Sequence, residues 1–172
     1  MNHRIRVTFA AAATALGLVA TTTPAGALPA YTTDPTSYSN PRLQGQPKVV
    51  GLRVSEHARF DRVVIDIDGR RPGYRVRYVA QLTYDGSGEV VPLKGRKRIS
   101  IVLDPARAHD LSGHNVYTGP RLQQYDLPML RGVAFAGDFE GVVSFGLTAR
   151  AKRGYRVFTL TDPSRVVIDL RH

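Results

Sequence analysis

The chain of 172 residues contains no cysteine. Without thiols, no disulfide can cross-link the fold, and no thiolate can serve as a nucleophile or a metal ligand. A lipid anchor on cysteine is excluded for the same reason. The folded part of the chain must therefore be stabilised by a hydrophobic core.

Long hydrophobic runs and helical patterns are also missing. The longest apolar run, Val7 to Ala20, is shorter than the roughly 20 residues that a membrane-spanning helix needs. No segment keeps an apolar period of 3.6 residues over the length of a helix, which disfavours an α/β architecture. Ser87 and Ser112 lack a G-x-S-x-G context, which argues against a nucleophilic serine. No recognised nucleic-acid-binding motif occurs.

The N-terminal residues have the features of an export signal. Arg4 and Arg6 precede the apolar run, and Ala25-Gly26-Ala27 offers a cleavage site. We predict a signal peptide over residues 1–27, with an uncleaved membrane anchor as the alternative. The mature protein is then expected to be soluble and secreted, without a membrane span.

One five-residue string occurs twice in the chain. Arg62-Val63-Val64-Ile65-Asp66 returns as Arg165-Val166-Val167-Ile168-Asp169. Both copies are β-branched runs with polar ends, typical of half-buried strands. We therefore expect the last strand of the domain to close against its first ones. Residues 28–46, rich in Pro, Thr, Ser and Tyr, are predicted to be a flexible leader, and residues 47–172 one folded domain.

Short alternating runs separated by turn residues dominate this domain. Seven to eight such strands predict an all-β fold, an antiparallel β-sandwich of two small sheets. Asp85-Gly86 predicts a hairpin whose returning strand is Glu89–Leu93. Ala106–Leu111 could form one helical turn, and Ser112–Leu130 is the longest irregular segment, which is typical of a functional or loosely ordered loop.

Basic residues clearly outnumber acidic ones. The chain has 24 Lys plus Arg against 14 Asp plus Glu, and without Arg4 and Arg6 the mature form keeps 22 against 14, a net charge of +8. A basic secreted protein is attracted to anionic polymers, and a cell wall offers peptide carboxylates and phosphodiesters. A surface charge that only confers solubility is the alternative. Export and the missing motifs exclude nucleic acid as a partner.

Several short motifs between Val49 and His172 occur in a characteristic order and spacing. They are Phe60-Asp61-Arg62-Val63-Val64, Pro72-Gly73-Tyr74-Arg75-Val76-Arg77-Tyr78, Asp85-Gly86-Ser87-Gly88, Ala108-His109-Asp110, Gly137-Asp138-Phe139-Glu140-Gly141 and Asp162-Pro163-Ser164-Arg165-Val166-Val167-Ile168-Asp169. Together they resemble the AMIN-like domain proteins of actinobacterial cell envelopes, distant relatives of the AMIN modules of peptidoglycan amidases and secretins. The resemblance implies a β-sandwich of two small sheets that binds or targets the cell wall and carries no catalytic activity.

Arginines on the predicted strands are the first candidate ligand-binding residues. Arg75 and Arg77 leave the same face of one strand, and Arg156 occupies the corresponding place in a second Gly-Tyr-Arg-Val string. Guanidinium groups suit bidentate contacts with carboxylate or phosphate. The alternative is structural pairing across strands. The acidic residues available for such pairing are Asp66, Asp68 and Asp169.

Tyrosines could stack on sugar rings. Tyr117 and Tyr125 lie in the long irregular segment and are expected to be exposed and to bind ligand. For the tyrosines that alternate with valine on strands, a place in the core is expected for at least two. These are Tyr74, Tyr78 and Tyr155.

Acidic and histidine residues are interpreted as structural. His109, Asp110 and His114 lack a third strong ligand beside them, so no metal site is expected. His109 is expected to cap or brace the turn after Pro105. Asp138 and Glu140, two residues apart between glycines, are expected to form a turn in which Asp138 bonds nearby backbone; a glycosidase pair is the alternative.

The sequence therefore predicts a secreted, non-catalytic module of the cell envelope, without cofactor or metal, that acts as a monomer. Its predicted partner is peptidoglycan or an associated anionic polymer. The alternatives are a module that recruits an envelope enzyme through protein contacts and, less favoured, a small secreted hydrolase.

Overall fold

The two copies of the repeated pentad are paired with each other in the middle of a sheet. In the computed structural model, which describes residues 27–172, they lie in β3 (Phe60–Asp68) and β10 (Arg165–Arg171). The strands run antiparallel, with Arg165 opposite Asp66 and Asp169 opposite Arg62. Each copy thus places its arginine against the aspartate of the other copy. The prediction that the last strand closes against the first ones is confirmed.

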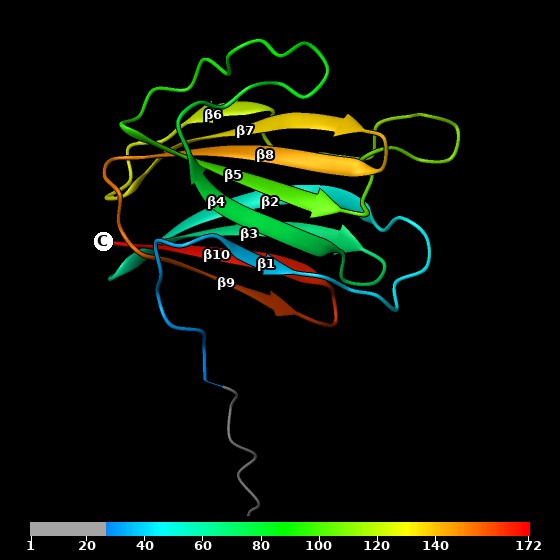
Figure 1. The fold of residues 1–172 in the computed structure, drawn as a ribbon, viewed down its shortest axis with the longest axis horizontal. Helices are drawn as coiled ribbons and strands as arrows, with labels where there is room; N and C mark the ends of the chain where they lie inside the picture. Colours follow the sequence, from blue (N-terminus) through cyan, green and yellow to red (C-terminus); the bar gives the residue numbers. More distant parts are fainter. Residues whose placement is uncertain (1–26) are drawn as a thin grey trace, which may run out of the picture.

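Within residues 27–172, ten strands form two antiparallel sheets, which lie one above the other in Figure 1. The four-stranded sheet has the order β2-β3-β10-β9, with β2 (Lys48–His57) and β9 (Tyr155–Leu160) at its edges. The six-stranded sheet has the order β1-β4-β5-β8-β7-β6. Its strands are β1 (Thr36–Tyr38), β4 (Gly73–Val79), β5 (Lys97–Asp104), β6 (Leu122–Gln124), β7 (Leu130–Phe139) and β8 (Val142–Ala149). The predicted all-β sandwich of two sheets is confirmed.

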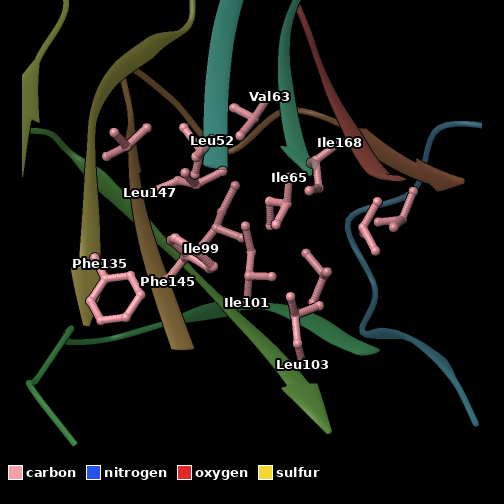
Figure 2. Close-up of a cluster of buried hydrophobic side chains, with 14 of the residues drawn as sticks. Leu52, Val63, Ile65, Ile99, Ile101, Leu103, Phe135, Phe145, Leu147 and Ile168 are labelled. Atoms are coloured by element: carbon pink, nitrogen blue, oxygen red, sulfur yellow. The ribbon is translucent and has the colours of Figure 1, made fainter. Parts of the chain in front are cut away.

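Alternate residues of the strands fill the space between the sheets, because successive side chains of a strand point to opposite faces. Figure 2 shows Val63 and Ile65 of β3 and Ile168 of β10 facing Ile99 and Ile101 of β5, and all five are fully buried. Each such side chain contributes roughly 1.5–3 kcal/mol by its burial.

A second, smaller cluster covers part of the outer face of the six-stranded sheet. The chain between β4 and β5 crosses this face and buries Leu82 and Leu93 against it. Glycines in the strands make room for them, since a Cβ atom at Gly146 or Gly132 would lie 2.8 Å from a leucine methyl group. The predicted strand Glu89–Leu93 is wrong, because only one antiparallel bridge forms across the predicted Asp85-Gly86 turn, between Thr83 and Val90.

The structure has more strands than the seven to eight predicted, and the additional ones are three residues long. One of them, β1, lies within residues 28–46, so the flexible leader predicted there is in part a packed edge of the six-stranded sheet. Before it, Thr32 exchanges two backbone hydrogen bonds of 2.8 Å with Tyr155. A three-residue edge strand pairs through its backbone, so no alternating side-chain pattern marks it in the sequence.

The remaining differences concern single segments. Ala106–Leu111 forms no helical turn; its backbone follows β2, with Val49 donating to Arg107 at 2.8 Å. The predicted signal peptide lies outside the described residues except for Ala27. Within residues 27–172, no helix exists that could cross a lipid bilayer.

Candidate functional site

Arg75 and Arg77 lie on the outer face of the six-stranded sheet, and both are exposed. Neither forms an ion pair with any other described residue, so the alternative that they pair with nearby aspartates is wrong. Those aspartates have other partners, because the register brings different cations beside them. The observed pairs are Lys48–Asp68 at 2.6 Å, Arg53–Asp66 at 2.7 Å, and Arg62 and Arg156 with Asp169, each at 2.7 Å.

Arg156 is not on the same surface as these two arginines. Its neighbour Val157 and the neighbour of Arg75, Val76, both point into the core from opposite sheets. The arginines therefore leave opposite outer faces of the sandwich. Arg156 is held by the buried carboxylate of Asp169, with Nε 2.8 Å from Oδ2.

The two tyrosines of the long segment differ from each other. Tyr117, expected to be exposed, is 3% exposed and packs between Phe135 and Phe145. Its hydroxyl donates to the carbonyl of Pro120 at 3.0 Å, and burial raises its pKa. The expectation of exposure is wrong because this irregular segment closes one side of the core. Tyr125 is half-buried, and desolvation raises its pKa.

The acidic and histidine residues form pairs rather than a metal centre. His109 Nδ1 lies 2.7 Å from Asp138 Oδ2, so Asp138 bonds a side chain and not the nearby backbone as expected. Glu140 does not belong to this pair. It lies in the two-residue turn between β7 and β8, with a φ of 49°. Asp110 accepts the backbone N–H groups of His114 and Ser112, which lowers its pKa. Among residues 27–172, no group of three or more His, Asp or Glu side chains is placed to hold a metal ion.

Tyr125 opens onto a basic pocket of about 890 Å³. The pocket lies where β5 and β7 begin and β8 ends, and Gln124 lines it beside Tyr125. Arg131 is paired with Asp126, whereas the other cations of the wall have no ion-pair partner among the described residues. Those cations are Lys94, Arg96 and Arg150.

Two basic stretches of the chain meet at this pocket. Residues 94–98 enter β5 and residues 150–153 leave β8, and the two strands pair with Lys97 opposite Ala149. Arg59, between β2 and β3, and Arg171, at the end of β10, lie at the same end of the sandwich, marked by the C-terminus in Figure 1. We call this the basic end. Its nine cations without an ion pair in the described structure are Arg59, Lys94, Arg96, Lys97, Arg98, Arg150, Lys152, Arg153 and Arg171.

The opposite end of the sandwich differs in charge. The turns there carry acidic residues, namely Asp68, Asp104, Glu140 and Asp162. Because acids partly offset the cations there, the positive charge of residues 27–172 is concentrated at the basic end. In the sequence, the basic end is visible only as two separate basic runs, residues 94–98 and residues 150–153. The pairing of β5 with β8 brings the two runs together.

Comparison with known proteins identifies one family. The model of the AMIN-like domain family matches residues 47–172. This range begins one residue before β2 and includes all strands except β1. Comparison with curated proteins and with solved structures gave no match.

Proposed function

Since this chain belongs to the AMIN-like domain family, whose members are typically non-catalytic modules of extracytoplasmic envelope proteins, we propose that it is a secreted module that binds an anionic polymer of the cell wall. The observation that carries the proposal is the basic end, where nine cations lie together without carboxylate partners in the described structure. The basic pocket is the centre of the binding surface.

The composition of the pocket supports an anionic partner. Guanidinium groups donate to carboxylate and phosphate oxygens in pairs, and an ammonium group adds a compact charge. Lys94, Arg96 and Arg150 are exposed and can make such contacts without breaking an ion pair. Tyr125 offers a ring face on which a sugar can stack. A polymer with repeated negative charges can then contact the pocket and the neighbouring cations together.

Removing charge at the basic end should weaken binding more than removing it elsewhere. We expect Arg96→Ser with Arg150→Ser to lower the affinity for purified, protein-free wall roughly tenfold or more, because two contacts of about 1 kcal/mol each are lost. Wild-type binding should also fall in 1 M salt, where the Debye length is about 3 Å. A pull-down on wall measures both effects.

The matched control is Arg42→Ser with Arg70→Ser, which removes the same charge from exposed positions at the opposite end. It should bind like the wild type. Equal loss in both double variants would show that only net charge matters and would refute the pocket. Binding that requires wall-associated proteins would favour the alternative, a module that recruits an envelope enzyme.

Arg75 and Arg77 remain candidate contacts on the outer face of the six-stranded sheet. Their double change to Ser should leave the melting temperature almost unchanged, because neither side chain has an ion-pair partner within the described structure. If this variant binds wall less well than the Arg96/Arg150 variant, the strand face and not the pocket is the main binding surface.

The proposed secretion can be tested at the N-terminus of the protein. The N-terminal residues of the secreted protein, read by N-terminal sequencing, should begin at Leu28 or within a few residues of it. Protein that keeps Met1 and stays in the membrane fraction would contradict the proposed signal peptide.

A further inference from the structure

The outer face of the four-stranded sheet carries a second pocket, which is separate from the basic pocket. It has a volume of about 370 Å³ and is lined by Tyr31, Arg59, Phe60, Arg156 and Arg171. We call it the arginine–aromatic pocket. It shares no residue with the basic pocket, and its walls come from β9, β10, the turn between β2 and β3, the start of β3 and the chain before β1.

The inner wall of this pocket is rigidly held. Asp169, fully buried, binds Arg62 through both of its oxygens and also binds Arg156. Its two arginines stack on rings: Arg156 lies 4.7 Å from the centre of Tyr31 and 5.3 Å from that of Phe60. Since cation–π contacts and the carboxylate fix both guanidinium groups, the wall needs no reordering to receive a ligand.

The outer wall carries charge that the protein leaves uncompensated. Arg59 and Arg171 are exposed, and neither side chain forms an ion pair or a hydrogen bond with another described residue. Arg156, by contrast, shares the carboxylate of Asp169 with Arg62. The pocket therefore combines a fixed aromatic wall with two guanidinium groups that have no carboxylate partner in the described structure, and Arg171 lies 5.8 Å from the centre of the Tyr31 ring.

We infer that the arginine–aromatic pocket binds a sugar ring that bears a carboxylate. The ring of Phe60 is already stacked on His57 and covered by Arg62, so Tyr31 is the ring that can receive the apolar C–H face of a sugar. The planar carboxylate suits the paired donors of Arg59 or Arg171. Ligand pockets commonly measure about 300–1,000 Å³, so this one accommodates a single ring and not a longer chain. A bare phosphate or acetate ion would leave the aromatic wall unused.

This inference goes beyond the proposed function, because it assigns a different pocket and a ligand defined by ring and carboxylate together. It can hold if the basic pocket binds no wall polymer, and it can fail while wall binding through the basic pocket stands.

Three small probes separate the ring from the charge. Glucuronate carries both, methyl glucoside carries only the ring, and acetate carries only the carboxylate. In NMR titrations of the mature protein, we expect glucuronate to shift the backbone amides of Tyr31, Arg59, Phe60 and Arg171. The other two probes should bind roughly tenfold more weakly or worse, because each lacks one of the two contacts.

Variants locate the binding. Arg59→Ser with Arg171→Ser should weaken glucuronate binding roughly tenfold or more, since charged hydrogen bonds are lost, and should melt like the wild type. Tyr31→Ala should weaken glucuronate without changing the response to acetate. Arg42→Ser with Arg70→Ser, which removes the same charge from exposed positions at the opposite end, is the matched control and should bind glucuronate normally.

Several outcomes would overturn the inference. Equal binding of acetate and glucuronate would remove the role of the ring, and equal binding of methyl glucoside would remove that of the carboxylate. Amide shifts centred on Lys94, Arg96 and Arg150 would place glucuronate in the basic pocket. Unchanged glucuronate affinity in the Arg59/Arg171 variant would exclude the pocket opening as the site.

Discussion

A chain of residues 28–162 should not fold. The missing residues form β10, which is an inner strand of the four-stranded sheet and pairs with both β3 and β9. Val166, Ile168 and Leu170 are each at most 1% exposed. Their burial contributes roughly 1.5–3 kcal/mol each, a sum comparable with the whole stability of about 5–15 kcal/mol of a small domain. Circular dichroism should show no cooperative thermal transition.

The control for this truncation is a chain that begins at Pro47. It lacks β1, an edge strand whose residues are at least partly exposed and which pairs on one side only. We expect this longer deletion to lower the melting temperature but to leave a cooperative transition. A chain without β10 that melts cooperatively near the full-length temperature would show that the terminal strand is peripheral.

The sequence predicted the strands of the sandwich well where side chains decide the structure. The two pentads, predicted to be half-buried strands, lie in β3 (Phe60–Asp68) and β10 (Arg165–Arg171). A strand with one face in the core must alternate, and this alternation is visible in a single sequence. Pairing of the two pentads was predictable for the same reason, because two strands with identical buried residues can share one core.

Features that depend on register or on contacts between distant segments were not predictable. Alternation places Asp169 on the outer face, but only the register brings two arginines to it and buries it. Alternation gives no information about Leu82, which lies on an irregular segment and is buried because Gly146 leaves space beneath it. Tyr117 was wrongly expected to be exposed, because it too lies on an irregular segment and is buried by contacts with distant strands.

The candidate site, too, was only partly predictable from the sequence. Net charge and the family resemblance pointed to an anionic partner, and Tyr125 was among the predicted contacts. Nothing in the sequence says that residues 94–98 lie beside residues 150–153. The β5–β8 pairing, between segments about 50 residues apart, brings the two stretches together.

Asp169→Ala should be among the most destabilising single changes in this protein. The carboxylate is fully buried and holds the guanidinium groups of Arg62 and Arg156, whose side chains are 25% and 14% exposed. Removing it leaves two like charges close together and largely desolvated. Breaking a buried ion pair in this way costs about 3–5 kcal/mol. Urea denaturation of a chain of residues 28–172 measures the change in free energy of unfolding.

The repeated pentad supplies the matched control, because Asp66 occupies the same position in the first copy as Asp169 in the second. Asp66 is paired with Arg53, whose side chain is 62% exposed. Exposed ion pairs contribute only about 0–1 kcal/mol, so Asp66→Ala should have a small effect. The different environments of two identical sequence positions therefore predict a several-fold difference in cost. Similar losses in the two variants would show that the arginine pair around Asp169 is not a stabilising centre of the fold.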